Sequence, residues 1–338
     1  MNNNNSNDKI DLVILWVDGS DPNWLKEKNK YSLKKEDISN QINRYRDWGL
    51  LKYWFRGVEK YAPWVNKIHF VTWGHLPEWL DTNNPKINIV KHEDIIPKEY
   101  LPTFNSNVIQ FYLNRIEGLS DRFIMFDDDQ FIINKVSPKD FYDGNRICDN
   151  YIESVFHISI LGDVYPHSLL NNIQCINKYY NKKAFYKKNF LKIYSPKNGI
   201  KLNFKTLLTS GYNNFIGIYS HHICQAYTKK HYELFWKYCE KELKECSNNK
   251  FRNYNDLTTF LVRYIALVEG DFVPRSINFG KRFELSENNQ IIISNIINQK
   301  YKVICMNDSN LTIDINKTKQ ELIEAFNKIL PEKSSYEI

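Results

Sequence analysis

The chain of 338 residues has little glycine, no closely spaced cysteine pair and no long apolar run, and each absence excludes a class of protein. With 12 Gly and neither a P-loop nor a G-x-G-x-x-G motif, a glycine-rich phosphate cradle is excluded. No stretch approaches the roughly 18 apolar residues of a membrane span. The six cysteines lack a C-x-x-C pair, which predicts reduced, mostly buried thiols of a cytosolic protein. Residues 1–8 read as a disordered tail and not as a signal peptide.

Acidic residues are missing from one long stretch. Residues 164–232 contain eleven Lys and no Asp or Glu, and we call them the basic stretch. The whole chain has a formal net charge of +7, so the remainder is net acidic. Such a stretch indicates an anionic partner. Candidates are a nucleotide sugar, a phosphodiester polymer, an anionic membrane surface or nucleic acid.

Carboxylates are present where they are chemically informative, at the ends of three short apolar runs. These runs are IDLVILWVDGSDP (10–22), RFIMFDDDQF (122–131) and YKVICMND (301–308), each typical of a buried strand. In open α/β sheets, ligands bind outside the carboxyl ends of strands. Three consecutive aspartates repel one another unless a cation or strong solvation compensates. The pattern therefore predicts a divalent cation that holds a diphosphate.

Strand and helix signals alternate along the first half of the chain, which predicts an α/β fold with a mostly parallel sheet flanked by helices. We expect a nucleotide-sugar-binding half at 9–142, a basic insertion or lid at 143–220, and the rest of the same catalytic domain at 221–338. Strands are expected at 10–17, 67–73, 86–92, 122–126 and, returning to the sheet, 301–305. Helices are expected at 47–61, 105–116, 232–246, 256–268 and 322–330.

Four blocks of the sequence resemble the conserved blocks of the Stealth family of sugar-phosphate transferases. The first is WVDGSDP, and the second begins with RYRDWGLLKYWFRGVEKYAPWVNKIHFVT (44–72) and continues to DFY at 140–142. The third runs from His222 through FRNYNDL to about Gly270, and the fourth is ICMND (304–308). The family includes bacterial capsule and cell-surface hexose-1-phosphate transferases and the animal N-acetylglucosamine-1-phosphotransferase. The resemblance implies a core like that of GT-A nucleotide-sugar transferases.

The resemblance also implies a reaction. Hexose-1-phosphate would pass from a nucleotide sugar, a UDP-hexose or UDP-N-acetylhexosamine, to a hydroxyl of a glycan or lipid-linked oligosaccharide. Nucleoside monophosphate would leave, and Mg²⁺ or Mn²⁺ would neutralise the phosphoryl charge. Nucleic acid is not an expected partner. The location implied is the cytoplasm, either free or peripheral at the inner face of the cell membrane.

Site residues follow block by block. The candidate metal ligands are Asp128, Asp129 and Asp308. His222 is the preferred general base because imidazole titrates near working pH, with neighbouring His221 and Asp256 as alternatives. Arg252 and Asp18 complete the catalytic candidates. The substrate-binding candidates are Gly19, Arg44, Arg46, Asp47, Asn105, Ser106, Arg115 and Asn307.

Two other functions stay open on the residues alone. A metal-dependent glycosyltransferase would use the same acidic strand ends but release nucleoside diphosphate. A non-enzymatic binder of anionic polymer or nucleic acid would explain the basic stretch and its aromatic residues. That second alternative leaves the three acidic strand ends unexplained. The identity of the sugar, nucleotide and acceptor, the linkage and the oligomeric state do not follow from the sequence.

Overall fold

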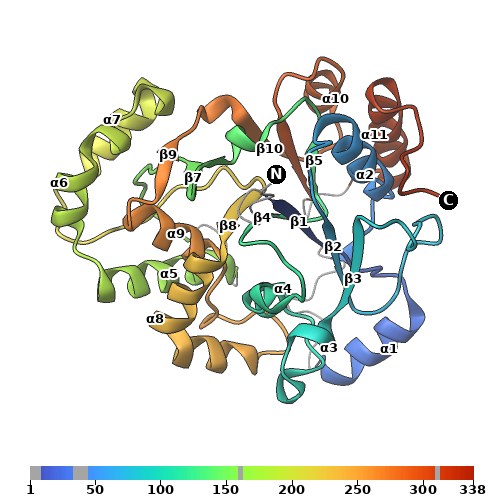
Figure 1. Ribbon diagram of the computed structural model, residues 1–338, viewed down its shortest axis with the longest axis horizontal. Helices are drawn as coiled ribbons and strands as arrows, with labels where there is room; N and C mark the ends of the chain where they lie inside the picture. The colour runs from blue at the N-terminus through green and yellow to red at the C-terminus, as the bar shows by residue number, and fades with distance from the viewer. Residues whose placement is uncertain (1–8, 33–44, 159–162, 309–312) are drawn as a thin grey trace, which may run out of the picture.

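A computed structural model describes residues 9–32, 45–158, 163–308 and 313–338. The predicted disordered tail lies outside these residues. A central sheet runs through the molecule with helices packed on both faces (Figure 1). The predicted α/β class with a mostly parallel sheet is confirmed. None of the described helices is long and apolar enough to cross a bilayer.

The main sheet has five strands in the order β3-β2-β1-β4-β8, and all pair in parallel except β8, which is antiparallel to β4. Its central strand β1 is buried on both faces, as its continuous apolar sequence requires, and Leu12, Val13 and Ile14 are each 0% exposed. The strands are β1 (Ile10–Leu15), β2 (Ile68–Thr72), β3 (Ile87–Lys91), β4 (Arg122–Phe126) and β8 (Gln225–Thr228).

The strand predicted at 301–305 forms, but it does not return to the main sheet. β11 (Val303–Asn307) lies between β10 (Gly280–Glu284), to which it is parallel, and β5 (Gln130–Ile132), to which it is antiparallel. Because β5 follows β4 after the three aspartates, this second sheet begins where the main sheet ends. A third small sheet contains β6 (Tyr142–Asp143), β7 (Arg146–Asp149) and β9 (Phe272–Pro274).

The helices form near their expected positions, with shifted ends. The helix expected at 105–116 stops at Phe111 and continues as a 3-10 turn over Leu113–Arg115. The helices are α1 (Pro22–Tyr31), α2 (Leu51–Tyr61), α3 (His92–Ile95), α4 (Ser106–Phe111), α5 (Tyr165–Tyr179), α6 (Lys182–Ile193), α7 (Ile200–Thr209), α8 (Lys229–Ser247), α9 (Phe260–Val268), α10 (Gln290–Ile297) and α11 (Ile315–Ile329).

The basic stretch contains α5, α6, α7 and β8, so it is more regular than its sequence indicates. Not all its lysines face solvent. Lys182 is 2% exposed, and its Nζ lies 2.8 Å from a carboxylate oxygen of Glu153. The same Nζ donates to the Thr209 carbonyl oxygen at 2.9 Å. Lys182 therefore ties α6 to α7 and does not serve an external anion.

The C-terminal segment closes over α2. Arg56, 8% exposed, donates from Nε and a terminal nitrogen to both carboxylate oxygens of Glu337, at 2.8 and 2.7 Å. Its other terminal nitrogen donates to the carbonyl oxygens of Leu330 and Pro331. A two-pronged pair of this kind fixes geometry as well as charge. It joins residues 281 positions apart.

A second buried pair joins α9 to β7 and gives a stability prediction. Arg263 donates to both carboxylate oxygens of Asp149, at 2.6 and 3.1 Å, and is 2% exposed. Asp149→Ala leaves a buried guanidinium unpaired, so we expect the free energy of unfolding in urea to fall by about 3–5 kcal/mol. Asp143→Ala, which removes an exposed pair with Arg146, should change it by less than about 1 kcal/mol. Equal effects would contradict the buried-pair interpretation.

The same pair sets a pH dependence. Burial alone would raise the pKa of Asp149, but the charge and hydrogen bonds of Arg263 outweigh it and hold the pKa below the ordinary 3.8. The stabilisation by this pair is therefore complete above that pH and is lost as the pH falls through the lowered pKa. Below pH 3.8, unfolding measurements should show a smaller difference between the wild type and Asp149→Ala.

Candidate active site

A cavity of about 740 Å³ opens where β1, β4 and β11 end. Main-sheet residues line one side, and the ends of β10 and β11 line another. The cavity brings together nine of the site residues predicted from sequence. They are Arg46, Asp47, Ser106, Asp128, Asp129, His222, Arg252, Asn307 and Asp308. They come from segments as far apart in sequence as Arg46, before α2, and Asp308, after β11.

Three consecutive carboxylates form the acidic part of this cavity. Asp127 accepts hydrogen bonds from Gln110 Nε2 and Gln130 Nε2, both at 3.1 Å, so it is held rigidly. Asp128 is exposed to the cavity. Asp129 has one oxygen, Oδ1, that is buried and has no hydrogen-bond partner among the described residues. The aspartate run thus contains one fixed, one open and one partly unsatisfied carboxylate.

The surroundings oppose the negative charge on this run. Burial raises the pKa of Asp127 to about 7, the Asp129 carboxylate adds to the rise, and Arg252 acts against it. The pKa of Asp128 lies well above its ordinary range. The causes are loss of water around the carboxylate and then repulsion by Asp129 and Asp127, although part of the Asp128 side chain stays exposed to the cavity. Excess negative charge in a desolvated place is the condition that a bound cation relieves.

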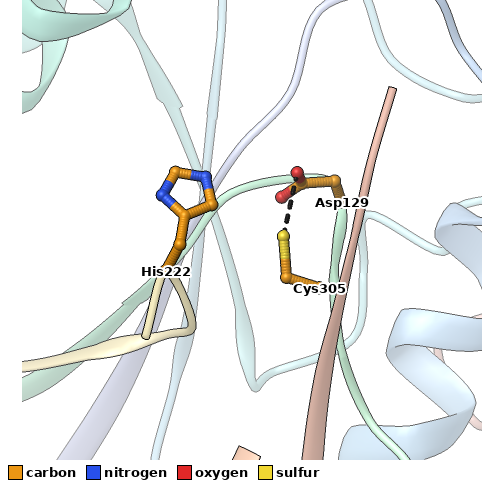
Figure 2. A group of neighbouring side chains, drawn as sticks. All are labelled: Asp129, His222 and Cys305. Carbon is orange, nitrogen blue, oxygen red and sulfur yellow. Dashed lines mark hydrogen bonds between the residues drawn. The ribbon is translucent and has the colours of Figure 1, made fainter. Parts of the chain in front are cut away.

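Figure 2 shows Asp129, Cys305 and His222 facing a common space. The Cys305 thiol donates to Asp129 Oδ2 at 3.2 Å. One potential ligand atom from each of the three residues lies within 4.8 Å of the others, so the group could hold a metal ion. Burial and the Asp129 charge raise the pKa of Cys305 well above its ordinary range, so its sulfur stays a protonated hydrogen-bond donor. The unsatisfied Asp129 oxygen and the repelling carboxylates beside it fit a cation held by oxygen ligands.

His222 occupies a left-handed backbone position with φ of 49°. That conformation is uncommon outside glycine and often marks functional sites. Its Nδ1 is buried and has no hydrogen-bond partner among the described residues. Burial lowers its pKa, with Asp129 acting in the opposite direction and Arg282 and Arg252 adding to the lowering. The imidazole is therefore neutral near neutral pH and can accept a proton.

His221, the alternative to His222, does not line the cavity. Its ring packs against Tyr219 with centroids 5.0 Å apart, and burial lowers its pKa to about 4. Of the two neighbouring histidines, only His222 lines the cavity beside Asp127–Asp129.

Three arginines line the same cavity as Asp127–Asp129. One terminal nitrogen of Arg46 donates to both carboxylate oxygens of Asp308, at 3.3 and 3.0 Å, just after the end of β11. Arg252 donates to Ser106 Oγ at 2.7 Å, at the first residue of α4. Arg282 on β10 also lines the cavity and donates to Glu284. Fork-shaped donors of this kind suit phosphate oxygens.

Asp18 and Gly19 follow β1 but do not line the cavity. The Asp18 carboxylate accepts the backbone N–H and hydroxyl of Ser20, an ordinary turn contact. Position 19 requires glycine because the Tyr45 backbone passes close to it, and a Cβ there would lie 1.9 Å from the Tyr45 carbonyl oxygen. Both residues shape the turn that supports the cavity wall at Tyr45.

Asp256 and Asn105 lie behind the wall and contact each other. Asp256 is 0% exposed, and its carboxylate accepts from Asn105 Nδ2 and Asn249 Nδ2, both at 2.7 Å, and from Asn253 N at 2.9 Å. Asn105 caps α4 by accepting from Asn107 N. Asp256 therefore holds the loop that carries Arg252 against α4. Among the described residues, no hydrogen bond or ion pair joins Asp256 to His222.

Two further candidates fall elsewhere. The Arg115 guanidinium lies over the rings of Tyr112 and Trp236, at 4.7 and 5.7 Å, and does not line the cavity. Arg44 lies outside the described residues. Sequence reasoning overlooked Gln110, Gln130, Cys305 and Arg282. All four depend on strand or helix pairings that no local motif reveals.

Two family models match the chain. They are described as Stealth protein CR1, conserved region 1, over residues 8–36, and Stealth protein CR2, conserved region 2, over residues 44–150. A solved galactosyltransferase structure, LgtC, covers 94% of this chain and 96% of its own, at 11% identity and a TM-score of 0.41.

Curated relatives match almost the whole chain. A Streptococcus pneumoniae protein named capsular polysaccharide phosphotransferase WcwK is 43% identical over 336 residues, which is 98% of each chain. The exopolysaccharide phosphotransferase cps2G of Lactiplantibacillus plantarum is 34% identical, covering 97% of this chain and 96% of its own. The receptor polysaccharide phosphotransferase WefC of Streptococcus oralis is 32% identical, covering 98% and 99%.

An α/β fold with an acidic, arginine-lined cavity at its strand ends, together with these full-length matches, defines an enzyme of the transferase class. The chain belongs to the Stealth family, as the motifs WVDGSDP and EKYAPWV predict.

Proposed function

We propose that this enzyme transfers hexose-1-phosphate from a nucleotide sugar to a glycan hydroxyl, forming a phosphodiester in a surface or capsular polysaccharide. The observation that carries the proposal is the convergence of Asp127–Asp129, His222 and three arginines on one cavity. The names of the full-length relatives support the same chemistry. The donor expected is a UDP-hexose or UDP-N-acetylhexosamine, and the acceptor a glycan or lipid-linked oligosaccharide at the inner face of the membrane.

His222 is the proposed general base. Its neutral imidazole and unpartnered Nδ1 are suited to take the proton from the acceptor hydroxyl as that oxygen attacks phosphorus. The phosphorus–oxygen bond to the nucleotide breaks, and nucleoside monophosphate leaves. Asp256 has all its contacts within the protein, so we assign it a positioning role toward Arg252.

Asp128 and Asp129, with Asp308 on the neighbouring strand end, are the proposed holders of Mg²⁺ or Mn²⁺. The cation would supply charge neutralisation at the diphosphate. Arg46 and Arg252 would direct their forks to phosphate oxygens, and Arg282 is added to them on its position in the cavity. We propose that Ser106, Asn307 and Asp47, which line the cavity, contact the sugar or nucleotide. Asp18, Gly19 and Asn105 would act indirectly, by supporting the cavity wall.

Product analysis tests the function. Purified protein is incubated with UDP- and GDP-sugars, Mn²⁺ or Mg²⁺ and a glycan acceptor, and the released nucleotide is identified by chromatography. We expect acceptor- and metal-dependent nucleoside monophosphate, with a phosphodiester signal in the glycan by ³¹P NMR. Reactions without metal or acceptor, and with Asp129→Asn, serve as controls.

Each other outcome selects a different function. Release of nucleoside diphosphate, without phosphorus in the glycan, would make the enzyme a glycosyltransferase. No turnover of any donor, together with tight, salt-sensitive binding of anionic polymer in the absence of metal, would favour the binding protein.

A further inference from the structure

Helix α7 buries polar residues and exposes most of its apolar ones. Its buried positions are polar: Thr206 is 0% exposed and Thr209 is 8% exposed. Thr206 Oγ1 accepts from the Glu153 backbone N–H at 3.2 Å, and Thr209 Oγ1 donates to the Thr206 carbonyl oxygen at 3.1 Å. The usual surface helix shows the reverse arrangement, with an apolar face turned to the core.

Four of the five apolar side chains of α7 are exposed, and the fifth, Leu202, is half-buried. Ile200, Phe204, Leu207 and Leu208, which we call the α7 apolar face, are 91, 59, 55 and 66% exposed. Their spacing of four, seven and eight residues places them on one side of the helix. On neighbouring α6, Phe190 and Leu191 are 59 and 85% exposed. Such a concentration of exposed large apolar groups marks an interaction surface.

Lysines accompany these apolar groups, with no acid between residues 164 and 232. Lys183, Lys187 and Lys188 on α6 and Lys201 and Lys205 on α7 are exposed. Within the described part of the chain, none of the five has an ion-pair partner. Exposed apolar side chains interleaved with unpaired lysines are the pattern of a helix that lies in a membrane interface.

We propose that α6 and α7 form a docking surface for an anionic phospholipid bilayer, with the α7 apolar face entering the headgroup region. A bilayer satisfies both kinds of side chain, because its acyl boundary accepts the apolar groups and its anionic headgroups attract the lysines. The surface lies at one end of the molecule, opposite α2 and α11, so the membrane can be engaged there without covering those helices (Figure 1).

Other occupants fit less well. In a symmetric dimer through this face, the same lysines would meet their own copies and repel. A soluble anionic polymer would satisfy the lysines but leave Ile200 and Leu208 in water. The proposal does not depend on the proposed reaction, since it rests on α6 and α7 alone.

Vesicle co-sedimentation of the full chain tests the docking surface. Binding is measured on phosphatidylcholine vesicles with and without phosphatidylglycerol, at low and high salt. We expect binding that requires phosphatidylglycerol and weakens with salt. Phe204→Ser/Leu208→Ser should lower the partition coefficient by about tenfold or more. Lys187→Glu/Lys188→Glu should lower it to a similar degree, about tenfold.

Matched controls lie at the opposite end of the molecule. Ile291→Ser/Ile315→Ser removes two exposed apolar groups of α10 and α11, and Lys317→Glu/Lys328→Glu reverses two exposed charges on α11. Both should bind vesicles as the wild type does. All variants change exposed residues, and circular dichroism checks that each is folded.

Three results would overturn the proposal. They are no vesicle binding by the wild type, equal binding by the α7 variant and the wild type, and a concentration-dependent dimer in light scattering that the α7 variant abolishes. Unchanged nucleotide release from a soluble acceptor in the α7 variant would separate membrane docking from the reaction itself.

Discussion

His222→Gln is expected to lower kcat by about 10²–10⁴-fold, the usual contribution of a positioned general base. Glutamine keeps the approximate size of the side chain but cannot take a proton from the acceptor hydroxyl. The loss should fall on kcat and not on the donor KM, because the proposed contacts to phosphate come from arginines. Initial rates of nucleoside monophosphate release over a range of donor and acceptor concentrations measure both quantities.

His221→Gln is the matched control, since the same substitution is made one residue away, outside the cavity. We expect its folded fraction to retain activity. Equal losses in the two variants would mean that the segment needs both histidines for its shape, and the assignment of the base to His222 would be wrong.

Asp129→Asn is expected to lower kcat/KM by about 10³-fold, equivalent to about 4 kcal/mol of transition-state stabilisation. The change removes the charge that the proposed cation needs while keeping the hydrogen-bond geometry to Cys305. A second readout does not depend on turnover. Mn²⁺ should raise the thermal midpoint of the wild type, because a ligand that binds only the folded state stabilises it, and should not raise that of the variant.

Asp143→Asn makes the same chemical change at an exposed position on β6, and it should preserve both activity and the Mn²⁺-dependent shift. If Asp129→Asn keeps the shift but loses activity, the cation is held by other residues. If it keeps both, Asp129 is not a ligand that the cation or the reaction needs.

The positions of the acidic residues were predictable because strand ends are local features. A run such as RFIMF followed by three aspartates specifies a buried strand and its tip without knowledge of the partners. The start of a helix near residue 105 was predictable for the same reason, because asparagine commonly caps a helix N-terminus. The sequence did not indicate how far each of these side chains would be buried. Asp256, proposed from sequence as a possible base, is fully buried, and its carboxylate accepts hydrogen bonds from three asparagines.

The parts of the site that were missed arise from distant pairing. Cys305 reaches Asp129 because β11 runs antiparallel to β5, which places Cys305 opposite Gln130. Arg282 enters the cavity because β10 is parallel to β11, in register with that same cysteine. No periodicity reveals either pairing. β10 (GKRFE) is mostly polar and gives no strand signal of its own, and the apolar run of β11 (VICMN) could equally have joined the main sheet, as was expected.

The Arg56–Glu337 pair has a consequence for how the chain folds as it is synthesised. The two partners are 281 residues apart, so α2 emerges from the ribosome long before the carboxylate that neutralises its buried arginine. Strand β5 likewise cannot pair until β11 has been synthesised, and one edge of β4 stays unpaired until β8 has been synthesised. Closing such distant contacts is slow because their loop-closure entropy must be overcome first. The N-terminal half is therefore expected to remain an incompletely packed, chaperone-dependent intermediate until the C-terminal segment becomes available.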